Sequence, residues 1–170
     1  MDKFQEIRPY QDDEVEAVLE SLLRDAEMLD SIARFYAPNF SRVLSFVARI
    51  FAKSKLKKQL CGVDSIREIQ HVIATYMDKM IEETTTSLTH SGLENLRPGR
   101  SYVFICNHRD IAMDPAFVNY MLYHAGFETL QIAIGDNLLK KPFVSDLMRL
   151  NKSFIVKRSV KGRELLASLR

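Results

Sequence analysis

The segment YVFICNHRDIAMDP, residues 102–115, joins two different sequence patterns. Its first part, residues 102–106, is a short apolar run of the kind that favours a β-strand. Its last residues begin a stretch, 114–126, that predicts a helix. Polar and charged side chains are concentrated between the two. The segment therefore predicts a strand that passes through a polar loop directly into a helix.

The same alternation continues towards the C-terminus. Residues 129–134 and 153–156 predict two more strands, and residues 142–150 predict a short helix that begins at a proline. Strands that alternate with helices indicate a parallel or mixed sheet. The fold class expected for this part of the chain is therefore α/β.

The N-terminal half has a helical period instead. Apolar positions recur at three- and four-residue steps over 12–36, again over 40–61, and again over 65–81. The last of these begins with Ser65 and Glu68 at the spacing of a capping box. We therefore predict a helical domain over 1–91, followed by an α/β domain over 92–170.

Composition excludes several classes of protein. The 170 residues are 46% hydrophobic and 27% charged, which is typical of a globular chain and excludes collagen, disorder and a disulfide scaffold. The formal net charge of +2 is too small to argue for a nucleic-acid partner.

Cysteine content and hydropathy indicate where in the cell the protein is expected. Cys61 and Cys106 lie far apart in the sequence, which predicts reduced thiols and no zinc site. The longest uncharged stretch, 115–127, is 13 residues long and too short to span a bilayer. We expect a cytoplasmic protein without a metal ion, with peripheral contact at the inner face of the membrane.

His108 is the candidate for acid–base chemistry. A histidine near its ordinary pKa can take a proton from a hydroxyl, and a carboxylate on its other ring nitrogen would hold the correct tautomer. Asp110 and Asp114 are both near enough in sequence to supply that carboxylate. The same residues would also suit a solvated or helix-capping cluster, so the residues alone leave both interpretations open.

These residues resemble a motif of the glycerolipid acyltransferases, which include lysophosphatidate and glycerol-3-phosphate acyltransferases. The resemblance covers about residues 92–158. In that family an Asn-His pair is followed, after four residues, by an aspartate; here Asn107-His108 is followed by Asp114 after five. The resemblance implies that His108 is the catalytic base and Asp114 its partner, with Asp110 as the alternative partner.

A second block supports the resemblance. Residues 151–158, NKSFIVKR, look like the family's strand that ends in a basic residue contacting substrate phosphate. The resemblance implies that Arg158 binds phosphate, with Lys157 as a weaker candidate, and that Arg109 and Asn107 also contact substrate. The turn at residues 135–137 matches a region near the family's active site, but an ordinary capped turn explains it better.

One block is missing. The family's third motif contains a Glu-Gly pair, and this chain has no Glu-Gly dipeptide. We therefore expect the chain to hold only part of the acyltransferase domain, truncated before that block.

The resemblance implies transfer of an acyl group from acyl-CoA or acyl carrier protein to a hydroxyl of a glycerophosphate or lysophospholipid, in phospholipid synthesis. The thioester is then a co-substrate, and no cofactor is implied. The main alternative is a non-catalytic fragment or a membrane-peripheral binding module. A thioesterase or other hydrolase, with water as the acceptor, is a more distant alternative.

A basic segment raises the question of membrane contact. Residues 39–60 contain six basic side chains and no acidic one, interleaved with apolar residues. A helix lying on an anionic bilayer would have this composition. A helix packed against its neighbours with a basic solvent face would have it too. Nucleic acid is disfavoured, because the first helix is acidic.

Overall fold

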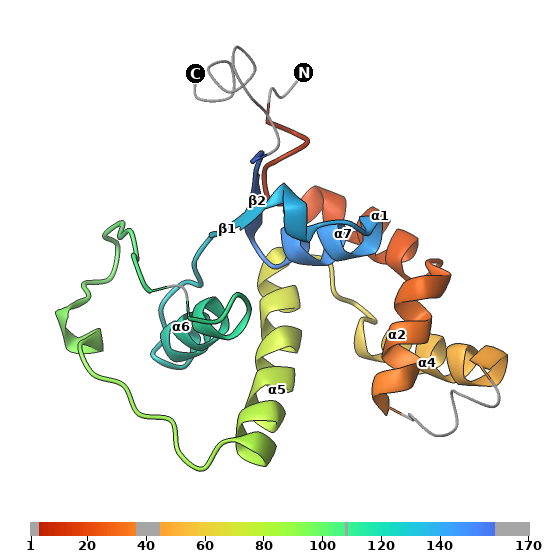
Figure 1. The fold of residues 1–170 in the computed structure, drawn as a ribbon, viewed down its shortest axis with the longest axis horizontal. Helices are drawn as coiled ribbons and strands as arrows, with labels where there is room; N and C mark the ends of the chain where they lie inside the picture. Colours follow the sequence, from red (N-terminus) through yellow and green to blue (C-terminus); the bar gives the residue numbers. More distant parts are fainter. Residues whose placement is uncertain (1–3, 37–44, 108, 159–170) are drawn as a thin grey trace. The chain divides into compact units, whose positions relative to one another are not determined.

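The computed structural model describes residues 4–36, 45–107 and 109–158 (Figure 1). The chain divides into two compact units, one of residues Met1–Ile69 with Ala133–Arg170 and the other of Gln70–Ile132. The predicted boundary at residue 91 falls inside the second unit. The division into domains over 1–91 and 92–170 therefore stays a prediction.

The first predicted helix is in fact two helices. α1 spans Asp12–Leu22 and α2 spans Ala26–Tyr36. Asp25 separates them, because its side chain accepts a hydrogen bond from the backbone N–H of Met28 at 2.8 Å and so caps α2. The prediction of one continuous helix is wrong here, since the apolar period runs on across a residue whose side chain competes for the backbone.

The next two helices agree with the expected pattern. α4 spans Ser45–Gln59, within the predicted 40–61, and the start of that prediction lies outside the described residues. α5 spans Ile66–Thr84. The Glu68 N–H donates to the Ser65 hydroxyl at 3.4 Å, and the Glu68 carboxylate accepts from the backbone of Asp64 at 2.8 Å. The residues that predicted the start of this helix therefore do cap it.

Small side chains form the contact between α2 and α4. Ala33 on α2 and Ala48 and Ala52 on α4 are buried against one another. Beside them, Arg49 donates two hydrogen bonds of 2.8 Å to the carboxylate of Asp30. This paired geometry orients α4 on α2, which lie side by side in Figure 1.

The sheet has two parallel strands in the described residues. β1 spans Ile132–Gly135, α7 spans Pro142–Leu150 and β2 spans Ser153–Val156. The predicted bounds of α7 and β2 are confirmed, and β1 begins later than the predicted 129–134. The structure is therefore rich in helix, with a small sheet compatible with the α/β class.

The N-terminal segment before α1 lies along α7 and β2. The carbonyl of Ile7 accepts a hydrogen bond from the backbone N–H of Ile155 at 2.8 Å, and Tyr10 N–H donates to the carbonyl of Arg149 at 3.3 Å. The Arg149 guanidinium lies 4.0 Å from the centre of the Tyr10 ring. α1 packs on α7, with Val15 among the most buried side chains.

In the second unit, α6 spans Met113–His124, close to the predicted 114–126, and a short 3-10 turn spans Leu93–Asn95. The residues of α5 in this unit contact α6 through polar side chains, with 2.7 Å between His71 Nδ1 and the Tyr123 hydroxyl. His124 and Asp78 make a second contact at 2.9 Å.

The strand predicted at residues 102–106 is not formed. The segment has an alternating exposure that suits a strand: Val103 and Ile105 are 89% and 92% exposed, whereas Tyr102 and Phe104 are 41% and 42% exposed. A strand is defined by its ladder of hydrogen bonds, and among the described residues the sheet consists of β1 and β2. Residues 102–106 thus show the alternation of a strand, but they do not pair with another strand in the described part of the chain.

Candidate active site

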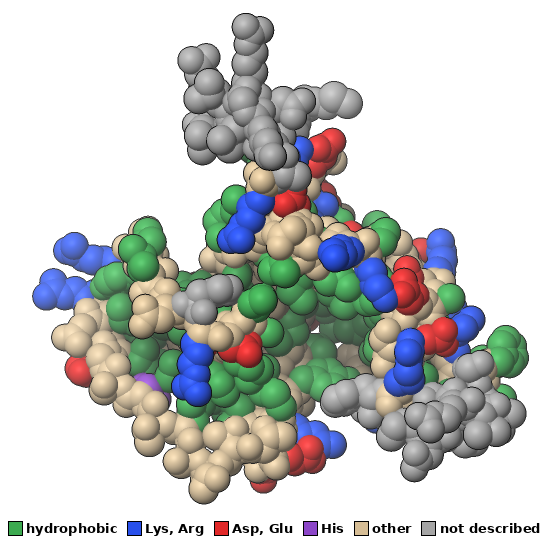
Figure 2. Space-filling model, in the orientation of Figure 1, with side chains coloured by type: hydrophobic (Ala, Val, Ile, Leu, Met, Phe, Trp, Pro, Cys, Tyr) green, Lys and Arg blue, Asp and Glu red, His purple; other side chains and the backbone are tan. Residues whose placement is uncertain are grey.

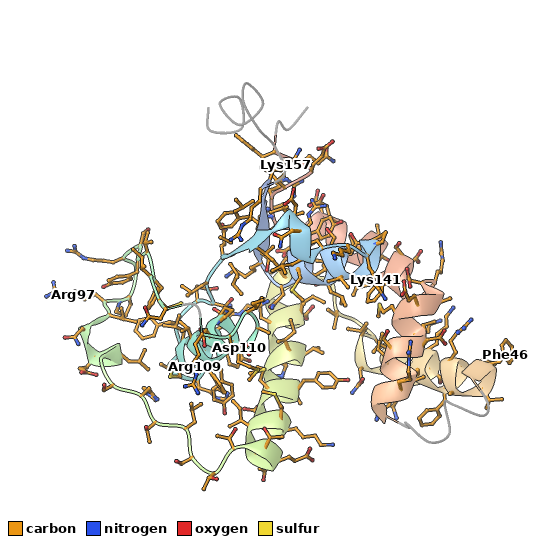
Figure 3. All side chains as sticks on the ribbon, viewed as in Figure 1. Phe46, Arg97, Arg109, Asp110, Lys141 and Lys157 are labelled. Atoms are coloured by element: carbon orange, nitrogen blue, oxygen red, sulfur yellow. The ribbon has the colours of Figure 1, made fainter. Side chains whose placement is uncertain are left out.

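The loop that follows His108 is organised around one carboxylate. Asp114 Oδ2 accepts hydrogen bonds from the backbone N–H of Arg109 at 2.8 Å and of Asp110 at 3.0 Å. Asp114 lies in the first turn of α6, where a negative charge also interacts favourably with the helix dipole. These hydrogen bonds bring the sequence-predicted residues Arg109, Asp110 and Asp114 together. Figure 3 shows Arg109 and Asp110 next to each other at the start of α6.

Asp110 has a different task in the same loop. Its Oδ1 accepts hydrogen bonds from the backbone N–H of Ala112 at 2.9 Å and of Met113 at 2.7 Å. Those groups belong to the start of α6, whose first N–H donors have no partner within the helix. Asp110 therefore caps α6, while Asp114 reaches back to the amide that follows His108 in the chain.

His108 itself lies outside the described residues, and its predicted contact with a carboxylate stays a prediction. Asn107 and Arg109 on either side of it are exposed. The loop from Arg109 to Asp114 is therefore held at the surface with side chains that a substrate can reach.

The second group of predicted residues lies where β2 ends. Lys157 and Arg158 follow β2 directly, and the turn after β1 begins at Asp136. Asp136 Oδ1 accepts a hydrogen bond from the backbone N–H of Arg158 at 3.1 Å. The carboxyl ends of the two parallel strands thus meet at one edge of the sheet, which is where α/β sheets place ligands.

Gly135 allows this close approach. A Cβ at position 135 would lie 3.0 Å from Arg158 Nε, 3.1 Å from Arg158 Cδ and 2.5 Å from Asn137 Oδ1. The φ of Gly135 is −73°, so its backbone does not require glycine. The space that the missing side chain leaves is instead filled by the side chains of Asn137 and Arg158. The turn at 135–137, interpreted from sequence as an ordinary turn, therefore also positions the predicted phosphate ligand.

Lys157 has a partner that the sequence did not indicate. Its ammonium lies 3.3 Å from a carboxylate oxygen of Glu6, in the segment before α1. Both side chains are well exposed, so the pair adds little stability. Among the predicted phosphate ligands, Lys157 is thus partly neutralised. Glu6 and Asp136 both escaped sequence reasoning, because each meets its partner only through the fold.

The two groups of predicted residues belong to different units. Arg109, Asp110 and Asp114 lie in the second unit, and Lys157 and Arg158 lie in the first. Within the described residues, no cluster of three or more His, Cys, Asp or Glu side chains could hold a metal ion. In the same part of the chain, no helix is both long and apolar enough to cross a membrane.

Known proteins match the part of the chain that contains both groups. The family model for acyltransferases matches residues 87–169, which include both groups. A glycerol-3-phosphate acyltransferase from Xanthomonas axonopodis pv. citri is 28% identical over 112 residues, covering 58% of this chain and 12% of that protein. One from Pseudomonas syringae pv. tomato is 27% identical over 104 residues, covering 61% of this chain and 12% of that protein. No solved structure matches the chain significantly.

Residues 87–169 are therefore similar to the acyltransferase family. These relatives are glycerolipid acyltransferases, the family that the motifs at 107–114 and 151–158 resemble. The chain spans only about an eighth of the length of these relatives, 12% in both alignments.

Proposed function

We propose that this chain is the part of a glycerolipid acyltransferase that activates and holds the acceptor, and that the acceptor is glycerol 3-phosphate. The observation that carries the proposal is the Asp114 carboxylate, held on the first amide after His108 by the loop of the family's Asn-His-Asp motif. The printed names of the relatives support this acceptor over a lysophospholipid.

The proposed reaction transfers an acyl group from a thioester, acyl-CoA or acyl carrier protein, to a hydroxyl. His108 takes the hydroxyl proton while the oxygen attacks the thioester carbonyl carbon. The carbon–sulfur bond then breaks, and the proton passes to the departing thiolate, so that an ester and a free thiol form. Asp114 orients His108 and stabilises the imidazolium. No covalent acyl-enzyme, metal ion or cofactor enters this scheme.

Arg158 is proposed as the main phosphate ligand. A guanidinium can hold a phosphate through two parallel hydrogen bonds, and its charge persists at any working pH. Lys157 and Arg109 would add positive charge, and Asn107 would donate hydrogen bonds to the substrate. The Glu6 carboxylate beside Lys157 supports the order of importance, with Arg158 first.

The test follows both products at once. The chain is incubated with acyl-CoA and glycerol 3-phosphate, and free thiol and lysophosphatidate are measured together. We expect equal amounts of the two, and loss of both in His108→Ala. His90→Ala is the matched control, because His90 is an exposed histidine of the same unit outside the proposed site.

Other outcomes separate the alternatives. Thiol release without lipid product would indicate a hydrolase. Product with lysophosphatidate as acceptor, but not with glycerol 3-phosphate, would correct the acceptor. Neither product from a folded sample would favour the non-catalytic module.

A further inference from the structure

The side of α4 that faces away from α2 carries large apolar side chains. Phe46, Val47, Ile50 and Phe51 are 70%, 46%, 54% and 61% exposed. Their spacing places them on adjacent turns of one helical face. Figure 3 shows Phe46 projecting from the end of α4, away from α2.

The opposite side of the helix holds the small residues. Ala48 and Ala52 are 3% and 1% exposed and pack against Ala33 of α2. An ordinary surface helix buries its large apolar residues and exposes polar ones. α4 does the reverse, although burying two phenylalanines would be far more favourable than burying two alanines. Large exposed apolar patches of this kind mark interaction sites.

Exposed lysines lie farther along the same face of α4. Lys57 and Lys58 are exposed and follow Phe46 and Val47 by 11 residues, about three helical turns, so each pair points in a similar direction. Lys53 is exposed as well. Residues 45–59 contain five basic side chains and no acidic one. Apolar and basic side chains both lie at the surface over this end of the first unit (Figure 2).

We propose that this face of α4, made of Phe46, Val47, Ile50, Phe51, Lys53, Lys57 and Lys58, docks on an anionic lipid bilayer. The aromatic and aliphatic side chains enter the boundary between headgroups and acyl chains, and the lysines contact lipid phosphates. With 15 residues, α4 is about 22 Å long, which is too short to span the hydrocarbon core but suits a helix lying in the interface.

An anionic bilayer can contact both the apolar side chains and the lysines of this face. Other binding partners would match only one of the two groups. In a symmetric contact with a second copy, the lysines of the two chains would repel one another. A nucleic acid would neutralise the lysines and leave the apolar half without a partner. The proposal depends on α4 alone and not on the proposed acyl transfer.

The first test is sedimentation of the 170-residue chain with vesicles. We expect it to bind vesicles of phosphatidylcholine with about a third phosphatidylglycerol, and to bind pure phosphatidylcholine at least about tenfold more weakly. Phe46→Ser with Phe51→Ser should weaken binding by at least about tenfold. The matched control is Val103→Ser with Ile105→Ser, which removes two exposed apolar side chains from the other unit and should not weaken binding.

Charge is tested in the same assay. Lys57→Gln with Lys58→Gln should weaken binding to anionic vesicles by roughly tenfold to thirtyfold. Lys79→Gln with Lys140→Gln removes the same charge from exposed lysines elsewhere and should have little effect. Equal losses in the two double variants would mean that net charge drives binding, which would overturn the proposal.

Insertion has its own readout, because the chain contains no tryptophan. In Phe51→Trp the single tryptophan should shift its emission to the blue on anionic vesicles and be quenched by brominated acyl chains. Phe104→Trp, at an exposed position of the second unit, should do neither. Circular dichroism verifies that each variant keeps its helix content.

Three further results would overturn the proposal. The first is an unshifted tryptophan emission from Phe51→Trp on vesicles that bind the protein. The second is the same blue shift in Phe104→Trp. The third is concentration-dependent dimerisation that Phe46→Ser with Phe51→Ser abolishes, which would assign the face to a second copy of the chain.

Discussion

The carboxylate of Asp114 accepts a hydrogen bond from the backbone N–H of Arg109 at 2.8 Å, across five positions of the chain. This bond closes the loop that follows His108 onto the first turn of α6. Asp110 holds the other end of the loop by capping α6. The two carboxylates that sequence alone could not tell apart thus have distinct positions.

We predict that Asp114→Asn lowers acyl transfer by roughly 100-fold or more, because the amide no longer stabilises the imidazolium of His108. The amide oxygen can still accept the loop hydrogen bonds, so stability should change little. Asp114→Ala removes the acceptor and should cost about 1 kcal/mol of unfolding free energy. Turnover and chemical unfolding, measured on both variants, test the prediction. A larger loss of turnover in Asp110→Asn would make Asp110 the partner instead.

We predict that Gly135→Ala raises the apparent KM for glycerol 3-phosphate more than that for acyl-CoA. The added methyl group would meet Asn137 at 2.5 Å and Arg158 at 3.0 and 3.1 Å, and so displace both side chains. Steady-state kinetics in both substrates measure the effect. The control is Gly126→Ala, which is strained by a φ of +79° and has open space around it. It should lower stability by about 1 kcal/mol without a selective change in KM.

The ion pair between Asp30 and Arg49 predicts a loss of stability in acid. Hydrogen bonds from Arg49, reinforced by its charge, lower the pKa of Asp30. A carboxyl group whose folded pKa is depressed contributes stability above its unfolded pKa of about 4 and loses it as the pH falls below that value.

Asp30→Asn should therefore lower the midpoint of thermal unfolding at pH 7, and the difference from the unmodified chain should shrink below about pH 4. The effect should be modest, because both side chains are about a third exposed, 35% and 31%. Thermal melts across this range measure it. Glu20→Gln is the control, since its pair with Arg24 is largely exposed and should leave the midpoint unchanged. A difference that persists in acid would contradict the assignment.

The Tyr10 hydroxyl predicts a loss of stability in alkali. Burial, followed by the hydrogen bond to Asp146 at 2.7 Å, raises the pKa of Tyr10 to about 12. Because the folded pKa lies above the usual value of about 10, the contribution is complete below pH 10 and is lost as the pH rises towards 12.

Tyr10→Phe should cost about 1 kcal/mol at neutral pH, because it removes the hydroxyl that bonds Asp146 and Arg149. It should also remove the tyrosine titration near pH 12, measured by tyrosinate absorbance. Chemical unfolding at neutral and alkaline pH measures the difference in unfolding free energy between Tyr10→Phe and the unmodified chain. This difference should shrink as the pH rises. Tyr102→Phe, in the other unit, serves as the control and should leave that titration in place.

Local features could be predicted from the sequence. The bounds of α7 and β2 agree with the prediction, because a proline start and short apolar runs act through neighbouring residues. The break at Asp25 was missed, since apolar residues continue the helical period on both sides of it. The strand at 102–106 was predicted from its alternation alone, but a strand also needs a partner that local sequence does not identify.

In the candidate site too, contacts between nearby residues could be predicted and contacts between distant residues could not. The residues of the Asn-His-Asp motif were identified from sequence, because the loop that brings Arg109 and Asp114 together spans five positions. The contacts of the basic end of β2 were not, because Asp136 meets Arg158 across 22 positions and Glu6 meets Lys157 across 151.

By itself the sequence indicated the family that residues 87–169 resemble, most helices, and which side chains are candidates for catalysis. Only the tertiary structure decided which carboxylate caps α6, why residue 135 is glycine, and that α4 packs by its alanines and exposes its phenylalanines. The reason is physical: capping and periodicity depend on nearby residues, whereas burial and ion pairing depend on which distant segments the folded chain brings into contact.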